Sequence, residues 1–307
     1  MVMTERWPRL ILASNGPTTV VFTALANAEF RDLIRDDFSF ELCLRKLSLE
    51  QQLKVRNAKH NREKALALGL FSLFTLNLAL YSAGAYKAFD PFRPLPIRFN
   101  RYGKPSLETG EGPVIEFNSS SSNEIMAVAV QFNRSTPIGI DLSHESQDSI
   151  SGTHFMEQFE GIFAASELVQ LKDLQDPNER YLLFNHLWTL KEGFTKFVGC
   201  GLNVDLASFH FTIGPNRPNL VEPTVVREEH YKRLELAWQR DISVDYENLT
   251  DEIKERISDP PVKCMSSILK AGPFLPVFIT FVSQAETVDP RVIALDMAEI
   301  VQGVIDE

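Results

Sequence analysis

Residues 177–199 read PNERYLLFNHLWTLKEGFTKFVG and are bounded like a single helix. Asp176 can accept a hydrogen bond from the first turn, and Pro177 suits the first helical position because its missing N–H is not needed there. Gly199 can take the left-handed conformation that commonly ends helices. The stretch therefore predicts a helix over 177–198 with both ends defined.

Three side chains on this helix share one face, because Trp188, Glu192 and Lys196 are spaced by four residues. Taken by itself, the Glu192–Lys196 spacing is explained by a surface ion pair contributing roughly 0.3–0.5 kcal/mol. Lys191 adds a second cation beside that pair, and the tryptophan on the same face indicates partial burial. These features favour a site for a charged ligand.

A second carboxylate, Asp141, lies near the end of the apolar segment 138–142, Ile-Gly-Ile-Asp-Leu. An acid at a strand end is often only a turn cap, but strand ends are also common positions for ligand-binding acids. Two acids from separate segments can share a divalent cation, and a lysine one turn beyond one of them can hold a phosphate. Asp141, Glu192 and Lys196 together predict phosphate chemistry.

The composition is that of a soluble globular protein, since 44% of the 307 residues are hydrophobic and 23% are charged. A net charge of −10 argues against a general nucleic-acid binder, which carries a basic field. The three cysteines are scattered, so neither a disulfide framework nor a CxxC metal site is expected, and a reducing, cytoplasmic location fits best. Residues 1–9 lack the pattern of a signal peptide.

The histidines give little indication of a metal or catalytic site. None of the six has HxH or HExxH spacing, which disfavours zinc. His144 and Glu145, just after Asp141, are further acid–base candidates, although a histidine in a loop is more often simply solvated.

A basic segment runs from Arg45 to Lys64, with seven basic residues against two acidic ones. A solvated helix face and an anion site for a phosphorylated ligand are both consistent with such a run of charge. The next segment, Ala65 to Tyr86, has no charged residue and is long enough to span a bilayer. Polar residues interrupt it, so we expect a buried helix of a soluble fold, with a membrane anchor as the alternative.

The rest of the chain predicts two halves that mix strands and helices, joined near residues 133–137. We expect an N-terminal half over 1–134, a C-terminal half over 135–284 and a C-terminal tail over 285–307. A proline-rich connector at 90–96 cannot be helical inside. Strands are expected at 11–25, 96–100, 114–117, 125–132, 138–142, 206–212, 234–237 and 277–282, and further helices at 48–80 with a break, 155–174 and beyond Pro290.

The order of motifs carries a family resemblance. The motifs are Gly103-Lys104-Pro105, Phe117-Asn118-Ser119-Ser120-Ser121, Ile138-Gly139-Ile140-Asp141, residues 188–196 and Gly199-Cys200-Gly201-Leu202. Together they resemble the 4′-phosphopantetheinyl transferases of the larger, pseudo-dimeric Sfp-like type, and most of all the fungal lysine-pathway enzymes that activate aminoadipate reductase. The resemblance extends from about Phe38 to Ser283.

The resemblance implies an α+β, pseudo-dimeric fold of two similar halves with coenzyme A and Mg²⁺ in the cleft between them. It implies transfer of phosphopantetheine from coenzyme A to a serine of an apo carrier-protein domain, expected to be that of aminoadipate reductase, with release of adenosine 3′,5′-bisphosphate. A monomer that binds neither nucleic acid nor membrane is expected. The N-terminal half would receive the adenine and 3′-phosphate of coenzyme A.

Each expected site residue follows from a matching motif position. Asp141, Glu192 and Lys196 match the catalytic group, with Glu192 also the proposed base for the serine hydroxyl and Lys196 next to the pyrophosphate. Asp141 and Glu192 match metal ligands, and Ser143 occupies the third metal position. The expected coenzyme A contacts are Lys104, Ser120, Ser121, Lys191 and Lys196, with Lys54 and Arg56 in the basic segment for the 3′-phosphate.

Two positions depart from the family pattern. Many relatives have histidine where this chain has Ser121, and a serine brings no positive charge to a phosphate. Many also have a third acid where this chain has Ser143, so a water or a weaker oxygen ligand is expected there. These departures motivate an alternative of another class, a non-catalytic protein that binds coenzyme A or a carrier.

Overall fold

The computed structural model describes residues 7–12, 18–122, 124–143, 159, 161–214, 223–228, 230–257, 261–271, 276–284 and 289–306. Helices and strands follow one another in separate runs, such as α2 to α5 (28–82) and then β2 to β6 (97–142), so the fold is mixed α+β, as predicted from the sequence. The helices are α2 (Ala28–Leu33), α3 (Asp37–Arg45), α4 (Leu49–Asn57), α5 (Arg62–Ser82), α7 (Ala165–Asp173), α8 (Pro177–Val198), α9 (Asp251–Lys254) and α10 (Met297–Ile305). Short 3₁₀ turns lie at Lys59–Asn61, Gly201–Asn203 and Leu206–Ser208.

The described strands form two principal sheets and two small ones. The six-stranded sheet has the order β4-β5-β1-β13-β9-β8, and the three-stranded sheet has the order β11-β12-β6. Pairs β10-β7 and β2-β3 complete the set. The strand bounds are β1 Thr18–Leu25, β2 Ile97–Phe99, β3 Pro105–Leu107, β4 Ile115–Ser122, β5 Ile125–Phe132, β6 Gly139–Leu142, β7 His210–Ile213, β8 Thr224–Arg227, β9 Lys232–Glu235, β10 Ile242–Asp245, β11 Lys263–Ala271, β12 Pro276–Ser283 and β13 Arg291–Ala294.

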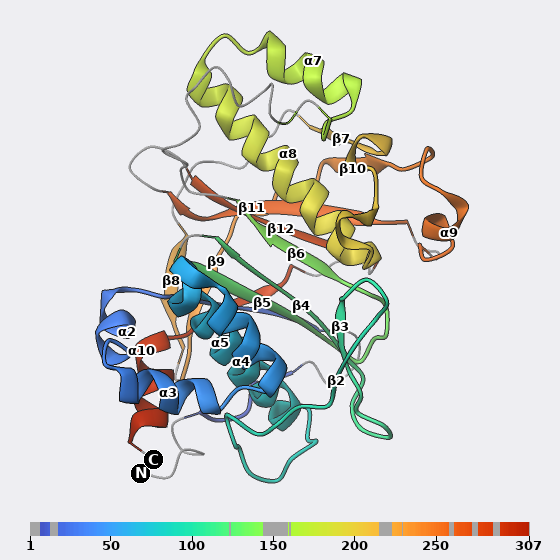
Figure 1. The fold of residues 1–307 in the computed structure, drawn as a ribbon. Helices are drawn as coiled ribbons and strands as arrows, with labels where there is room; N and C mark the ends of the chain where they lie inside the picture. Colours follow the sequence, from blue (N-terminus) through green and yellow to red (C-terminus); the bar gives the residue numbers. More distant parts are fainter. Residues whose placement is uncertain are drawn as a thin grey trace.

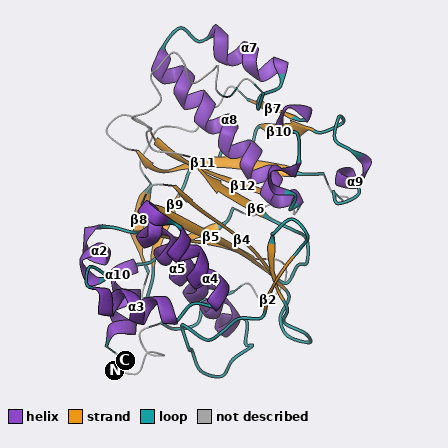
Figure 2. Ribbon diagram, in the orientation of Figure 1, coloured by secondary structure: helices purple, strands orange, loops and turns teal. Residues whose placement is uncertain are grey.

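The two principal sheets lie between two long helices (Figure 1). One apolar cluster fills the space between the six-stranded sheet and helices α3, α4, α5 and α10. A second lies between the two sheets and joins residues such as Val21 and Ala129 to Ile140 and Ile279. A third packs α8 against β7, β10 and β12. Figure 2 shows the resulting order of layers, with α5 on the outside of one sheet and α8 on the outside of the other.

Local signals in the sequence predict the helices before the proline-rich connector well. Ser48 caps α4 and exchanges hydrogen bonds with Gln51, the predicted capping box. The helical run is broken at the 3₁₀ turn Lys59–Asn61 and resumes as α5. Residues 90–96 are neither helix nor strand, which confirms the proline-rich connector.

Helix α5 is buried because it fills the main core, not because it is uniformly apolar. Leu66, Phe71 and Leu78 are among its side chains that are completely shielded from solvent. Asn77, one of the polar interruptions, donates from Nδ2 to the carbonyl oxygens of Pro91 (3.3 Å) and Arg93 (2.9 Å) and thereby holds the proline-rich connector on the helix. Among the described residues, only the helical stretch Lys59–Ser82 is long and apolar enough to cross a membrane.

The described residues 289–306 of the expected C-terminal tail are an integral part of the fold. Strand β13 pairs in parallel with β1 in the middle of the six-stranded sheet, and α10 packs on α2, α3 and α5. Strands β8 and β9 join the same sheet from within 135–284. Segments from beyond residue 134 therefore return to the N-terminal sheet.

Other differences are local. Helix α7 begins at Ala165, so the described residues 161–164 are not helical, and residues 155–158 and 160 of the expected helix lie outside the described part. The strand expected at 206–212 starts only at His210, because Leu206–Ser208 forms a 3₁₀ turn capped by Asp205. The helix beyond Pro290 is confirmed as α10, but strand β13 comes before it.

Candidate active site

Strand β6 and helix α8 approach closely where two glycines meet. A Cβ atom on Gly139 would collide with the carbonyl oxygen of Gly193 and would lie 2.7 Å from the backbone nitrogen of Phe197. Gly193 in turn packs on Thr280, whose Cγ2 would be 3.2 Å from an added Cβ. The absence of side chains at these positions brings the strand that carries Asp141 against the helix that carries Glu192 and Lys196.

Asp141 is held from two sides. Its Oδ1 accepts a hydrogen bond from Ser120 Oγ at 2.8 Å and an ion-paired hydrogen bond from Lys196 Nζ at 2.6 Å. The Asp141 side chain is 8% exposed and that of Lys196 is 27% exposed, so the pair lies at the surface of the site with the carboxylate inward. Charge-assisted hydrogen bonds of this kind are strong and directional, and they fix the orientation of the carboxylate.

The Asn-Ser element on β4 joins the two sheets at this point. Asn118 Oδ1 accepts from the backbone N–H of Ile140 at 3.0 Å, and Ser120 Oγ accepts from that of Leu142 at 3.3 Å. Backbone N–H groups of β6 thus donate to side-chain oxygens of β4, and we call this contact between the two strands the β4–β6 seam. Ser120, expected to contact coenzyme A, is therefore engaged in holding Asp141 and β6.

Glu192 faces the same site from α8 and is partly exposed. Burial raises the pKa of its carboxyl, the nearby charge of Asp141 raises it further, and Lys196 acts in the opposite direction. The structure thus brings Asp141, Glu192 and Lys196 together, as the sequence predicted. Two carboxylates that destabilise each other's charge form a site that a cation stabilises.

The donor set suits a hard divalent cation. Carboxylate oxygens together with phosphate oxygens and water are the ligands that Mg²⁺ prefers, and the raised pKa of Glu192 is the condition that a bound cation relieves. Asp141 and Glu192 are therefore the residues that could hold Mg²⁺. Among the described residues no group of three or more His, Cys, Asp or Glu side chains gathers.

Ser143 is less suited to the third metal position than expected. Its Oγ accepts a hydrogen bond from the backbone N–H of Phe278 at 2.7 Å, and the residue is completely buried. The hydroxyl therefore serves the β6–β12 pairing. His144 and Glu145, the other candidates in this loop, lie outside the described residues.

Lys191 is a structural residue, which corrects its expected contact with coenzyme A. Its ammonium group is fully buried and donates to the carbonyl oxygens of Leu206 and Phe209, each at 2.8 Å, and it pairs with Glu167 Oε2 at 2.8 Å. No N–H remains for a ligand. The helical spacing contains the signal, because Lys191 shares the apolar face of α8 with Leu187 and Phe194.

Lys104 likewise turns toward the protein. Its Nζ donates to the carbonyl oxygens of Ile138 and Phe197, both at 3.0 Å. Burial lowers the pKa of the ammonium to about 8, against the charges of Glu116 and Cys200, which act to raise it. Two of its three N–H groups thus bind the elements that carry the site, and the expected contact with coenzyme A stays a prediction.

Lys54 and Arg56, the two residues of the basic segment expected near the 3′-phosphate, lie in different surroundings. Lys54 Nζ pairs with Glu50 at 2.9 Å and lies 4.9 Å from the ring centroid of Phe99, at a cavity of about 290 Å³. Arg56 instead pairs with Glu41 on α3. The cavity is lined mainly by apolar side chains from α4, α5 and the β2–β3 hairpin, together with Gln51, Ser72 and Ser119.

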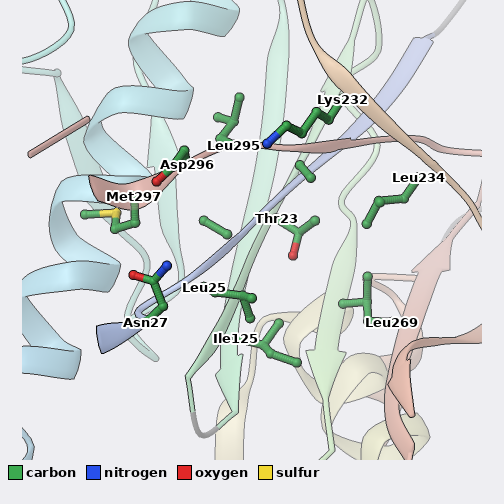
Figure 3. Close-up of a pocket in the computed structure, with 12 residues that line it drawn as sticks. Thr23, Leu25, Asn27, Ile125, Lys232, Leu234, Leu269, Leu295, Asp296 and Met297 are labelled. Atoms are coloured by element: carbon green, nitrogen blue, oxygen red, sulfur yellow. The ribbon is translucent and has the colours of Figure 1, made fainter. Parts of the chain in front are cut away.

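Ser121 is exposed at the end of β4, next to the buried Ser120. A different cavity of about 310 Å³ lies at the end of β1 (Figure 3). Its labelled lining includes Leu25, Leu234 and Lys232, and none of the motif residues borders it. It is therefore separate from the Asp141 site.

Sequence reasoning missed several residues that shape the site. Asn118 links the sheets, Gly139 permits the approach of β6 to α8, and Asn100 donates from Nδ2 to the carbonyl oxygen of Gly199 at 2.9 Å. Asn118 and Gly139 lie inside the quoted motifs, but nothing in the sequence says that their roles are contacts between distant segments.

Comparison with known proteins identifies relatives of this chain. Residues 137–249 match the family model described as the 4′-phosphopantetheinyl transferase superfamily. The L-aminoadipate-semialdehyde dehydrogenase-phosphopantetheinyl transferase of Saccharomyces cerevisiae is 30% identical over 186 residues, which cover 59% of this chain and 63% of that protein. The protein of the same name from Eremothecium gossypii is 32% identical over 173 residues, covering 56% and 58%.

A bacterial relative matches a shorter region. The 4′-phosphopantetheinyl transferase Sfp of Bacillus subtilis is 36% identical over 115 residues, covering 37% of this chain and 46% of that protein. The chain thus spans less than two thirds of the length of the Saccharomyces relative. Strands β6, β7 and β10 and helices α7 and α8 lie inside the matched family region. Residues 137–249 are thus similar to the 4′-phosphopantetheinyl transferase superfamily, and parts of the chain are similar in sequence to fungal and bacterial phosphopantetheinyl transferases.

Proposed function

We propose that this protein transfers the 4′-phosphopantetheine group of coenzyme A to a serine of an apo carrier-protein domain. The observation that carries the proposal is the convergence of Asp141, Glu192 and Lys196 at the β6–α8 contact, within the region that matches the transferase superfamily. Phosphoryl transfer asks a protein mainly for alignment and charge neutralisation, and two acids with a lysine supply both.

Each group has a distinct part in this reaction. Glu192, whose carboxyl has a raised pKa, accepts the proton of the carrier serine as its oxygen bonds to the phosphorus of the pantetheine phosphate. The phosphoanhydride bond breaks, and adenosine 3′,5′-bisphosphate leaves with the electron pair. Lys196 exchanges its contact with Asp141 for the phosphate oxygens and offsets their negative charge.

Magnesium is the metal we propose, with Asp141 and Glu192 as its protein ligands. When bound, it would neutralise the charge of the diphosphate and release the repulsion between the two carboxylates. Ser120 keeps Asp141 oriented through its 2.8 Å hydrogen bond. Ser143 supports the strand, and Ser121 is the exposed hydroxyl available to a phosphate.

We further propose that the fold is pseudo-dimeric, with coenzyme A between its halves. Support comes from the layers, in which α5 covers one sheet and α8 the other, and from the seam between β4 and β6. The cavity beside Lys54 suits a planar, partly apolar group next to a phosphate, so we assign the adenine and 3′-phosphate end to the N-terminal half. Arg56, already paired with Glu41, contributes only to the basic field.

The proposed physiological acceptor is the carrier domain of aminoadipate reductase, in lysine biosynthesis. The printed names of the fungal relatives support this choice. We propose a cytoplasmic monomer that needs no membrane or nucleic acid, with residues 289–306 contributing to the N-terminal half, where β13 and α10 pack.

The test is intact mass spectrometry of an apo carrier domain after incubation with the protein, coenzyme A and Mg²⁺. A mass increase of one phosphopantetheine group supports the proposal. Binding of coenzyme A without any mass increase on a panel of carrier domains, unchanged in Glu192→Gln, would instead identify a non-catalytic binder of coenzyme A.

A further inference from the structure

The β2–β3 hairpin, residues 97–107, comes from the N-terminal half but contacts the end of the helix that carries Glu192 and Lys196. Its turn closes with the backbone N–H of Asn100 donating to Lys104 O at 3.0 Å and that of Gly103 donating to Asn100 O at 2.9 Å. Gly103 has φ of +86°, a conformation that disfavours other residues. The Gly103-Lys104 motif thus builds a defined turn.

Asn100 uses both ends of its amide across this contact. Its Oδ1 accepts from the backbone N–H groups of Tyr102 and Lys104, each at 2.9 Å, so the side chain orders the turn. Its Nδ2 donates to the carbonyl oxygen of Gly199 at 2.9 Å, just past the end of α8. One side chain therefore connects the turn to the helix C-terminus, where carbonyl oxygens lack partners inside the helix.

Lys104 ties together the two elements that form the site. Ile138 O, one of its acceptors, directly precedes the glycine of the strand that carries Asp141. Phe197 O, the other acceptor, directly follows Lys196 in α8. A single ammonium group thus spans β6 and α8 with two hydrogen bonds of 3.0 Å. A cation at the negative end of a helix is also electrostatically favourable.

Gly199 fits this arrangement closely. A Cβ atom there would lie 2.8 Å from Lys104 Cδ and 3.2 Å from Asn100 Nδ2, and its φ is +75°. The stem of Lys104 therefore passes directly over the helix end. The hairpin is further attached to α9, since Tyr102 OH donates to Glu252 Oε1 at 3.1 Å.

We propose that Lys104 and Asn100 are positioning residues, which hold the end of α8 against β6 and so set the separation of Lys196 and Glu192 from Asp141. The effect on kcat rests on the proposed transferase function. The attachment of the hairpin to the end of α8 and to β6 does not. It differs from a direct contact with coenzyme A, which would leave the Lys104 ammonium facing the ligand instead of two backbone carbonyl groups.

Steady-state kinetics separate the two roles. In Lys104→Met, the positioning role predicts a fall in kcat of at least about tenfold with KM for coenzyme A changed by less than about threefold. A direct contact predicts the opposite, a raised KM with kcat largely kept. Lys87→Met is the matched control, because Lys87 is exposed and forms no hydrogen bond or ion pair within the described part of the chain, and its kinetics should equal those of the wild type.

Asn100→Asp provides a second variant in case Lys104→Met does not fold. It keeps the Oδ1 that accepts both hydrogen bonds of the turn but cannot donate to Gly199 O, so kcat should fall while the global melting temperature stays close to that of wild type. An unchanged kcat in a folded Asn100→Asp would overturn the part assigned to this residue.

Hydrogen–deuterium exchange without coenzyme A tests, independently of activity, whether the hairpin holds the end of α8. The amides of the last turn of α8 should exchange at least about tenfold faster in Lys104→Met than in Lys87→Met, while those of α5 stay unchanged. Equal exchange in the two variants would overturn the proposal. A wild-type protein that transfers nothing would refute the proposed function alone, since the exchange comparison still decides whether the hairpin holds the helix.

Discussion

Gly139 is the residue whose replacement should be least tolerated. A methyl group at this position would meet Gly193 O, Phe197 N and Phe197 Cβ, and none of these atoms can move away by a side-chain rotation. We expect Gly139→Ala to destabilise the fold by about 3 kcal/mol or more, since overpacking against backbone forces strand and helix apart. Urea unfolding measures the change in free energy.

The control for this prediction is Gly161→Ala. An added Cβ at Gly161 would meet nothing within 4 Å, so its free energy of unfolding should stay near the wild-type value. Equal stability of both variants would mean that β6 and α8 are not in close contact.

Because of Lys104, the free energy of unfolding should change with pH in the alkaline range. Its pKa is about 8 in the folded protein and 10.5 without the fold, so between these values the unfolded chain binds more protons than the folded one. The free energy of unfolding of the wild type, relative to Lys104→Met, should therefore rise with pH across this window, by at most about 3 kcal/mol. Paired denaturation curves at pH 7.5 and at about pH 10 test the sign. A relative loss of stability at the higher pH would contradict the burial of the ammonium.

At the scale of secondary-structure elements, α7 is attached to α8 through a buried ion pair. Glu167 accepts from Lys191 and from the backbone N–H groups of Ala164 and Phe211, and both charged side chains are completely shielded from solvent. Removing one partner leaves the other charge buried and unpaired. We expect Glu167→Gln to cost about 3–5 kcal/mol of unfolding free energy.

The double variant Glu167→Gln/Lys191→Met tests this pairing. Its loss of stability should be clearly smaller than the sum of the two single losses, because the second change removes the charge that the first one stranded. Strict additivity in thermal or urea unfolding would show that the two side chains do not interact.

The sequence predicts elements best where the signals are local. Helix α8 was predicted with its N-cap at Asp176 and its left-handed end at Gly199 because both signals lie within the helix itself. Strand β13 was missed, since its place beside β1 depends on a parallel pairing between the two ends of the chain. The acids and Lys196 were found as a set, but the burial of Lys191 depends on Glu167 and on carbonyl groups of a separate segment.

At the scale of the whole molecule, α5 decides whether the protein behaves as soluble. Its apolar surface is covered by the six-stranded sheet and by α4 and α10, and Asn77 Nδ2 donates to the proline-rich connector. We expect the 307-residue protein to remain in the supernatant after high-speed centrifugation without detergent. Recovery only in the detergent-extracted membrane fraction would favour the anchor alternative.

The layered order of the fold explains how one chain builds a site from distant segments. The β4–β6 seam brings the Asn-Ser element to Asp141, the glycine contact brings α8 to the same place, and the hairpin closes the far end of the helix. Each of these contacts joins parts of the chain that are remote in sequence. Their common result is the group of Asp141, Glu192 and Lys196.

The most direct test of the central claim is tandem mass spectrometry of an apo carrier domain incubated with coenzyme A, Mg²⁺ and either the wild type or Glu192→Gln. The proposed mechanism predicts phosphopantetheine on one carrier serine with the wild type, a rate lower by at least about a hundredfold with Glu192→Gln, and no product when Mg²⁺ is chelated. Equal modification by the two proteins, or none by the wild type with any carrier, would contradict it.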